Sequence, residues 1–574
     1  MKILLCAVNA KYIHSNPAIH ILQAYSKSFA EAENVEIEVA EYSVNNRPEE
    51  VLADIYLRHP DVAAFSCYIW NWEYVRLLLS DLHSVKPELD IWAGGPEVSF
   101  DAERVLGENP DIKGVIVGEG EVTFKELAID HYGRMESDRE NAVDLKHIKG
   151  ICYRSGDETV FTGNRSLMDM DEVPFIYDSE DICLFDHKIL YYESSRGCPF
   201  SCSYCLSSVD KAVRFRSLEK VYSELQFFLD NKVPQVKFID RTFNIRHEHS
   251  LGILKYIREH DNGITNFHFE IAADLLSDEE LEVMSDMRPG LIQLEIGVQS
   301  ANTDTIKAVN RVMDLDKLTG MVRAVREMNN IHQHLDLIAG LPYEDYASFA
   351  RSFNVVYAMK PSQLQLGFLK VLKGSPMEEA AGKYGIIYKN RAPYEVLCTK
   401  WLTFEDVLRL KRIEEMVEIF YNSHQFTAAL GILEKAFTDA FSMFEQLADH
   451  YRDKGYFINT PSRIYRYNVL LEFASMADPE HEQLYRQALT FDLYYRENMK
   501  SRPEFAPDIT MFREQIRNLR ADRQIHIDVF DYDFTEWDAD TIPKRSEKPV
   551  FTAFDYEKRD PLYGNSTVSV LHVR

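Results

Sequence analysis

The stretch CPFSCSYC at residues 198–205 carries three of the eight cysteines of the chain, in the spacing C-x3-C-x2-C. It follows Arg196-Gly197 and an apolar run at 189–194 that is expected to form a strand. Three thiolates on one tight loop are suited to hold three irons of a cubane cluster. A [4Fe–4S] cluster has a fourth iron, which stays open to a chelating amino and carboxylate group. The loop therefore predicts a cluster held by Cys198, Cys202 and Cys205.

A zinc site or a chance grouping of thiols would also account for this cysteine loop. A zinc site uses the same residue type, but structural zinc sites need a fourth ligand and favour C-x2-C pairs. Three buried cysteines that happen to cluster would need no metal at all. The remaining cysteines are expected to pack as small apolar residues. They are residues 6, 67, 152, 183 and 398.

A series of strand-and-helix units is predicted after residue 188. The expected strands are 189–194, 235–240, 267–271, 291–297, 333–338 and 363–369. The expected helices between them are 217–231, 246–259, 277–287, 314–328 and 345–359. Six such units in series build a partial (β/α)6 barrel of the TIM type, with its active site at the carboxyl ends of the strands.

The N-terminal part alternates strands and helices with a shorter period. Its expected strands are 2–8, 35–40, 62–69, 89–93 and 114–118, with helices at 17–30, 48–58, 72–85 and 100–107. This alternation predicts a doubly wound parallel sheet. Gly94, Gly95 and Gly118 fall just after strands. Ligands bind at such strand ends, where glycine allows a large ligand to approach the backbone.

The chain is thus expected to be an α/β protein of four segments. A Rossmann-like domain spans 1–140, a linker with a short hairpin at 150–161 spans 141–188, and the barrel spans 189–400. Residues 401–574 are expected to form a mostly helical α+β domain, and they contain no motif that identifies a chemistry. Its expected strands are 525–530, 550–556 and 567–573.

Composition restricts the partners of the protein. The net charge is −28 over 574 residues, which disfavours nucleic-acid binding because such a surface repels phosphate backbones. No apolar run reaches the roughly 18 residues that a membrane span needs. Scattered cysteines without paired spacing favour a reducing, cytoplasmic location.

The cysteine spacing, with Tyr204 before the last cysteine, resembles the signature of the radical S-adenosylmethionine (SAM) superfamily. The resemblance implies that Glu295 or Gln299 hydrogen-bonds SAM and that Gly340 lets its adenine approach the backbone. It also implies that Arg311 pairs with the SAM carboxylate, which suits a bidentate guanidinium group. The motifs that carry it further are FIDRTF (238–243), LEIGVQS (294–300), LIAGLP (337–342) and KGSP (373–376), with Arg241 where a second Asp is usual.

The segments GGPE (94–97) and GVIVGEGEVTF (114–124) resemble the last two strand ends of B12-binding domains fused to radical SAM enzymes. The resemblance implies cobalamin at the sheet edge, near Gly94, Gly95 and Gly118. The D-x-H-x-x-G motif that supplies a cobalt ligand in many cobalamin proteins is absent. We therefore expect no histidine ligand from this chain and interpret His14 and His20 as surface or capping residues. A third feature, the aromatic group Tyr68, Trp70 and Trp72, is expected either to wall a flat corrin or to pack between domains.

The resemblance covers roughly residues 1–375 and implies an enzyme that cleaves SAM reductively at a [4Fe–4S] cluster. The first hypothesis is that this enzyme is a cobalamin-dependent methyltransferase acting on an unactivated carbon. The alternatives are a radical SAM enzyme without cobalamin that rearranges, cyclises or otherwise modifies its substrate, and a non-catalytic iron–sulfur or zinc protein. The implied partners are a reductant such as flavodoxin or ferredoxin and a small-molecule, peptide or lipid-like substrate. No residue is identified as catalytic.

Overall fold

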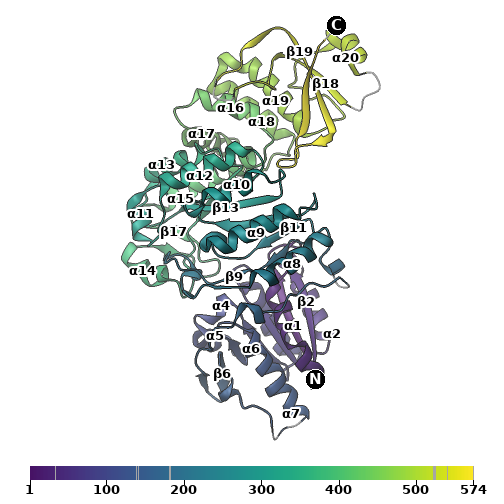
Figure 1. The fold of residues 1–574 in the computed structure, drawn as a ribbon. Coiled ribbons are helices and arrows are strands. Elements are labelled where there is room, and N and C mark those ends of the chain that lie inside the picture. Colours follow the sequence, from purple (N-terminus) through teal and green to yellow (C-terminus); the bar gives the residue numbers. More distant parts are fainter. Residues whose placement is uncertain are drawn as a thin grey trace. The chain divides into compact units, whose positions relative to one another are not determined.

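The computed structural model describes residues 1–32, 34–137, 139, 141–179, 182–520, 525–538 and 541–572. The chain forms two compact units, and the elements of both are labelled in Figure 1. The first unit consists of Met1–Asp286, Lys307–Met313 and Leu369–Thr399. The second consists of Met287–Ile306, Asp314–Phe368 and Lys400–Arg574.

The first unit begins with a seven-stranded sheet in the order β2-β1-β3-β4-β5-β6-β7. Strands β1 to β5 are parallel, and the hairpin β6–β7 extends the sheet in the antiparallel sense. The strands are β1 (Lys2–Asn9), β2 (Glu36–Ser43), β3 (Val62–Ser66), β4 (Asp90–Gly94), β5 (Gly114–Ile116), β6 (Ile151–Ser155) and β7 (Glu158–Phe161). The helices are α1 (Pro17–Ala32), α2 (Pro48–Leu57), α3 (Trp72–Val85), α4 (Pro96–Ser99), α5 (Ala102–Glu108), α6 (Glu121–Lys125), the π-helix η1 (Glu126–Gly133) and α7 (Arg134–Ser137).

Two hydrophobic cores lie on the two faces of this sheet. Alternate residues of β1 point to opposite faces, so Leu4, Cys6 and Val8 belong to one core and Ile3, Leu5 and Ala7 to the other. Helices α2 and α3 contribute to the first core, and α1, α6 and η1 contribute to the second. Helices on both faces define the doubly wound architecture that the sequence predicts.

The first unit also contains three parallel strands of the predicted barrel, β8 (Leu190–Tyr192), β11 (Gln235–Phe238) and β12 (Asn266–Ile271). Their helices are α8 (Leu218–Asp230), α9 (His247–Glu259) and α10 (Asp278–Ser285). Two short antiparallel pairs accompany them, β9 (Ser195–Arg196) with β10 (Arg214–Phe215), and β16 (Ile387–Tyr388) with β17 (Val396–Cys398). Helix α14 (Pro376–Tyr384) precedes the second pair.

The second unit contains the other three parallel strands, β13 (Ile292–Gln299), β14 (His332–Ala339) and β15 (Gln363–Phe368). Helices α12 (Leu315–Met328) and α13 (Tyr346–Tyr357) connect them. Helix α11 (Thr303–Ala308) follows β13 along the chain. All six predicted βα units are therefore present.

Residues beyond 400 are mostly helical, as predicted. The helices are α15 (Phe404–Met416), the π-helix η8 (Val417–Asn422), α16 (Thr427–Leu433), α17 (Ala440–Asp453), α18 (Tyr465–Ala477), α19 (Glu482–Arg496) and α20 (Arg513–Arg520). A three-stranded antiparallel sheet closes the chain, with β18 (Ile525–Tyr532), β19 (Arg545–Arg559) and β20 (Ser566–Leu571). Residue 573 of the predicted last strand lies outside the described residues.

The predicted strand at 62–69 is too long. Strand β3 ends at Ser66 because the Asn71 side chain forms hydrogen bonds with the backbone groups that would otherwise continue the strand. Asn71 Nδ2 donates to the carbonyl oxygens of Ser66 and Val8, and its Oδ1 accepts from the Tyr68 backbone N–H. This side chain fixes the turn that leads into α3.

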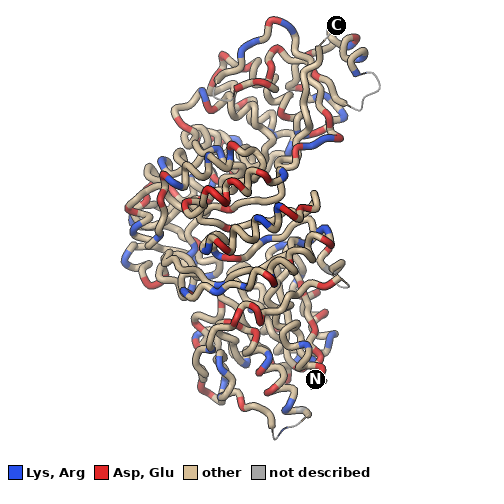
Figure 2. The backbone as a smooth tube through the Cα atoms, in the orientation of Figure 1, with Lys and Arg blue, Asp and Glu red and all other residues tan. Residues whose placement is uncertain are grey.

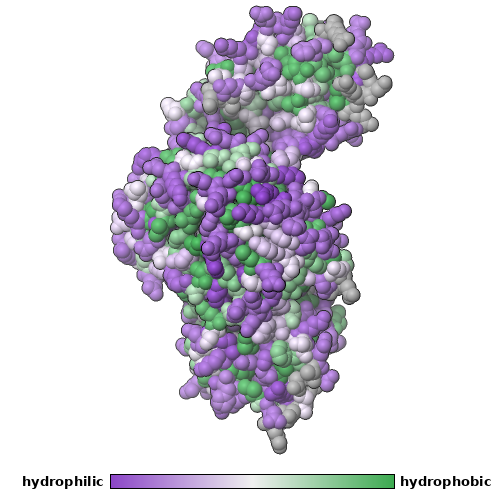
Figure 3. All heavy atoms as spheres, in the orientation of Figure 1, coloured by the Kyte–Doolittle hydropathy of each residue, from purple (hydrophilic) through white to green (hydrophobic). Residues whose placement is uncertain are grey.

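The surface agrees with the acidic composition. Figure 2 shows Asp and Glu along both units, with Lys and Arg interspersed among them. The face drawn in Figure 3 is mostly hydrophilic, with smaller hydrophobic groups between. Among the described residues, no helix combines the length and the apolar character that crossing a bilayer requires.

Candidate functional site

The cysteine loop is closed at its base by the antiparallel pair β9–β10, in which Arg196 lies opposite Arg214. Cys198 and Cys202 are buried and Cys205 is half-buried. The pKa of Cys198 is raised, mainly by burial, and the nearby Cys205 and Cys202 sulfurs add to the rise. The structure therefore places all three predicted ligands together on one loop. No further cysteine contributes to this loop among the residues described.

Arg311 lies against this loop. Its Nη1 is 3.3 Å from the Tyr204 hydroxyl and 3.9 Å from Cys202 Sγ. The backbone also ties the two segments together, because the Ser203 N–H donates to the Val309 carbonyl oxygen over 2.9 Å. A guanidinium at this position is within reach of a ligand that binds beside the cysteines.

Asp240 anchors the strand that leads into the cysteine loop, and the sequence did not predict this role. Its carboxylate accepts hydrogen bonds from the Ser194 backbone N–H, the Ser194 hydroxyl and the Ser195 hydroxyl, over 2.8, 2.6 and 2.6 Å. Complete burial raises the pKa of Asp240 to about 6, although these donors act in the opposite direction. The signal was its place in FIDRTF, two residues after the end of β11.

Gln299 and Gly340 lie at strand ends in the second unit, as predicted. Gln299 is the last residue of β13, follows an irregularity in the ladder and has φ 71°. Its buried Oε1 has no hydrogen-bond partner among the described residues, so this atom is a candidate to accept a hydrogen bond from a ligand. Gly340 follows β14 with φ 93°, a conformation that glycine adopts without strain.

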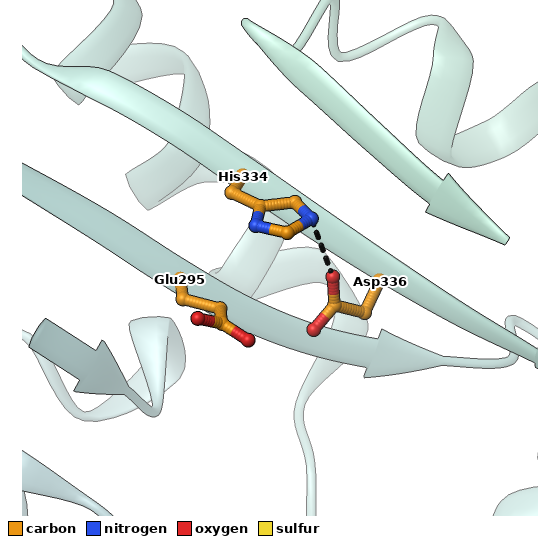
Figure 4. Close-up of side chains that lie close together, drawn as sticks. All are labelled: Glu295, His334 and Asp336. Carbon is orange, nitrogen blue, oxygen red and sulfur yellow. Dashed lines mark ion pairs between the residues drawn. The ribbon is translucent and has the colours of Figure 1, made fainter. Parts of the chain in front are cut away.

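Glu295 lies in the middle of β13 and not at its end. It faces His334 and Asp336 on the neighbouring strand β14, as Figure 4 shows. His334 Nε2 is 3.1 Å from Asp336 Oδ1. Sequence reasoning missed these two residues, although the H-x-D spacing of a strand places both side chains on one face.

The three predicted glycines of the N-terminal sheet lie at its carboxyl edge. Gly94 ends β4, Gly95 follows it, and Gly118 follows β5. Gly95 has φ 103°, and a Cβ atom there would lie 2.6 Å from the Cys67 carbonyl oxygen. Gly118 has φ 82°, and a Cβ atom there would meet nothing within 4 Å. Gly95 thus serves backbone packing, whereas Gly118 borders open space.

The carboxylates next to these glycines bind basic residues from later segments of the same unit. Glu119 Oε1 is 2.6 Å from Arg214 Nη2 and 3.2 Å from Arg196 Nη1. The buried Glu97 carboxylate is 2.9 Å from Lys373 Nζ and also accepts from the Tyr394 hydroxyl. The sheet edge and the base of the cysteine loop are therefore joined directly, which no local sequence pattern indicated.

The histidines near the first strand are engaged by other side chains. His14 Nδ1 is 2.6 Å from the Tyr191 hydroxyl, and His20 Nε2 is 3.5 Å from Glu41 Oε1. Tyr68 and Trp70 stack with ring centroids 4.2 Å apart, and Trp70 is 47% exposed. Tyr68 is half-buried, so Trp70 alone presents an exposed aromatic ring that fits a large flat ligand, and thiolates of the cysteine loop fit iron.

Comparison with known proteins finds family models that match the regions around the N-terminal sheet and the cysteine loop. Residues 5–128 match the model of the B12 binding domain, and residues 192–356 match that of the radical SAM superfamily. Residues 382–563 match a family described as protein of unknown function (DUF4080). The chain therefore combines a B12-binding domain with a radical SAM domain. Both matches fall in the regions that carry the predicted motifs, and a region that matches DUF4080 follows them.

The curated proteins that are similar to the chain include two methyltransferases. The 2-(S-pantetheinyl)-carbapenam-3-carboxylate methyltransferase of Streptantibioticus cattleyicolor is 26% identical, over 50% of this chain and 44% of its own length. The cobalamin-dependent radical SAM methyltransferase TokK of Streptomyces tokunonensis is 24% identical, over 59% of this chain and 51% of its own length. This chain thus spans about half the length of these relatives.

A similar solved structure is that of the radical SAM methyltransferase TsrM from Kitasatospora setae, with cobalamin and a [4Fe–4S] cluster bound. It is 15% identical, covers 68% of this chain and 80% of its own, and has a TM-score of 0.54. At this identity the likeness concerns the fold alone. It supports the predicted α/β fold class.

Proposed function

We propose that this chain is a radical SAM enzyme that binds a [4Fe–4S] cluster and SAM in its barrel (189–400) and cobalamin in its N-terminal domain (1–140). The reaction is methyl transfer to an unactivated carbon of a small-molecule, peptide or lipid-like substrate. The observation that carries the proposal is the loop of Cys198, Cys202 and Cys205, closed by β9–β10 and bordered by Arg311.

Each of these residues has a separate task in the proposal. The three cysteines hold the cluster, which, once reduced by a flavodoxin- or ferredoxin-type partner, supplies the electron that cleaves SAM. Arg311 pairs with the SAM carboxylate, since its Nη1 already lies 3.9 Å from Cys202 Sγ. Gln299 offers its buried Oε1 to a ribose hydroxyl or the amino group of SAM. Gly340 gives the adenine access to the backbone.

The carboxyl edge of the N-terminal sheet is the proposed binding surface for cobalamin, and we propose no histidine of this chain as a cobalt ligand. Gly94, Gly95 and Gly118 border this edge, and the stacked Tyr68 and Trp70 offer an aromatic surface beside it. His14 and His20 are held by Tyr191 and Glu41. We therefore propose that cobalamin binds here without a histidine of this chain on its cobalt.

The test is anaerobic reconstitution with iron, sulfide, hydroxocobalamin and SAM. Wild-type protein is expected to show cluster absorbance, to keep a corrin band after desalting and to release 5′-deoxyadenosine when reduced. Replacing Cys198, Cys202 and Cys205 by Ala should abolish the cluster and the product, whereas Cys398→Ala should keep both. A protein that forms 5′-deoxyadenosine without retaining corrin would favour the rearrangement or cyclisation alternative. A protein without any cluster would contradict the proposal.

A further inference from the structure

Strands β13 and β15 of the second unit are polar along one face. Burial alternates residue by residue throughout β13 and over the first four residues of β15, with apolar side chains on the buried face. The polar side chains are Gln293, Glu295, Gln299, Gln363 and Gln365. Parallel strands of α/β proteins are usually apolar on both faces. A polar face on such strands indicates a surface that meets a polar ligand.

Strand β14 continues this polar face. Gln333 Nε2 donates to the Val322 carbonyl oxygen of α12 over 3.1 Å, so the side of β14 that carries Gln333 lies against this helix. Because neighbouring residues of a strand alternate, His334 and Asp336 point to the opposite side. His334 is paired in the ladder with Glu295 of β13.

Glu295, His334 and Asp336 bring three ligand atoms together on this face. One carboxylate or imidazole atom of each lies within 4.8 Å of the other two, and the three side chains converge in Figure 4. His334 is 7% exposed, and the Asp336 side chain is 19% exposed. The group differs from an acidic patch at the surface, because it is sheltered and contains an imidazole.

We propose that Glu295, His334 and Asp336 form a binding site for a divalent first-row transition metal ion. Imidazole and carboxylate together are typical ligands of Zn²⁺, Mn²⁺ and Fe²⁺. An organic ammonium cation is a poorer match for this site, because it would gain little from the imidazole. Ligand atoms at about 2.1 Å from one metal lie about 3 to 3.6 Å apart. The 3.1 Å between His334 Nε2 and Asp336 Oδ1 meets this condition. The Glu295 carboxylate lies within 4.8 Å of both, and rotation of its side chain would bring an oxygen to the distance that a third ligand requires.

The site is separate from the proposed SAM contact of Gln299. Glu295 lies four residues before Gln299 on β13, which places it about 13 Å away along the strand. Three protein ligands leave coordination positions open for substrate atoms. The metal would thus bind a polar substrate group on the barrel face, and it neither requires nor replaces the cluster.

Mn²⁺ is the probe for this site, because thiolates of the cysteine loop bind it poorly. Cluster-loaded protein is titrated with Mn²⁺ under anaerobic conditions, and the free ion is followed by its six-line EPR signal. Wild-type protein is expected to remove one equivalent of Mn²⁺. Asp336→Asn and Glu295→Gln should each weaken this binding at least tenfold while cluster absorbance stays unchanged.

Asp478→Asn is the matched control. Asp478 pairs with His481 at 2.9 Å in the same unit but belongs to no three-residue group of this kind among the described residues. Its replacement should leave Mn²⁺ binding as in wild type. Glu295→Gln keeps the His334–Asp336 pair, so it tests the site even if Asp336→Asn fails to fold. Wild-type protein that leaves all Mn²⁺ free, or variants that bind it as wild type does, would overturn the proposal.

Discussion

Arg196 Nη2 donates a hydrogen bond to Glu121 Oε1 over 3.0 Å and thereby joins the base of the cysteine loop to the first helix residue after β5. Arg196 Nη2 also donates to Glu193 over 2.7 Å. Across the β9–β10 pair, Arg214 binds Glu119 of the same N-terminal segment. Both strands at the base of the loop are therefore held by carboxylates beside the edge where cobalamin is proposed to bind.

Glu119→Gln should loosen the base of the cysteine loop. Burial raises the pKa of Glu119, but the hydrogen bond from Arg214 and the charges of both arginines bring it below its usual value, so the side chain acts as a carboxylate. Removing one charge-assisted partner costs about 2 kcal/mol locally. This corresponds to roughly thirtyfold faster amide hydrogen exchange in 196–214, measured by mass spectrometry.

The control for this change is Glu126→Gln. Glu126 pairs with Arg165 on the same unit, and neither residue belongs to the loop or to β9–β10. Exchange in 196–214 should then stay as in wild type. Equal exchange in the Glu119 and Glu126 variants would show that the ion pairs do not hold the loop.

Arg311→Lys should weaken SAM binding about tenfold, because a lysine ammonium cannot form two parallel hydrogen bonds to a carboxylate. The change in the EPR spectrum of the reduced cluster on titration with SAM measures the affinity. Arg323→Lys, on the exposed side of α12, is the matched substitution and should leave the titration unchanged. An unaltered titration for Arg311→Lys would separate Arg311 from the SAM carboxylate.

The sequence predicted those features that depend on residues close to one another along the chain. Short apolar runs located β1 and β14 to within a residue or two, because burial of one or both faces of a strand sets this pattern. The three cysteines share one loop because only a few residues separate them. The end of β3 was missed because it depends on the Asn71 side chain, whose contact with the Val8 carbonyl oxygen spans 63 residues.

The long-range part of the site could not be read from one sequence. Glu119 and Arg214 are 95 residues apart, and nothing in either segment identifies the other as its partner. Gly95 was predicted from its place after a strand, and the sequence did not indicate that the Cys67 backbone approaches it so closely. The resemblance implied a SAM contact for Glu295 or Gln299, and nothing in the sequence around Glu295 indicated that His334 and Asp336 lie beside it on the neighbouring strand.

Glu344 should make the second unit less stable as the pH rises. Its buried carboxyl accepts from the Ser300 and Ser352 hydroxyls on Oε1, while Oε2 has no partner among the described residues. Burial raises the pKa of Glu344 to about 7. In the unfolded chain this pKa is about 4.3. Between these values the folded state binds the proton and the unfolded state does not, so the free energy of unfolding falls with rising pH.

Glu344→Gln removes this titration. The urea midpoint of unfolding, measured from pH 5 to pH 8, should fall less for Glu344→Gln than for wild type, with the difference growing up to about pH 7 and constant above it. Ser352 and Ser300 remain able to donate to the amide oxygen. Parallel pH profiles for the two proteins would mean that Glu344 is ionised throughout this range.

Gly95→Ala should destabilise the N-terminal sheet. The added methyl group would meet the Cys67 carbonyl oxygen at 2.6 Å, and a φ of 103° is unfavourable for alanine. Backbone strain of this kind costs about 1–3 kcal/mol before the clash is counted. The matched control is Gly107→Ala within α5, where a Cβ atom meets nothing within 4 Å and alanine is the better helix former by about 1 kcal/mol. Thermal unfolding should therefore shift in opposite directions for the two variants, and corrin retention should fall only for Gly95→Ala. A shift in the same direction would show that the close approach at Cys67 relaxes without cost.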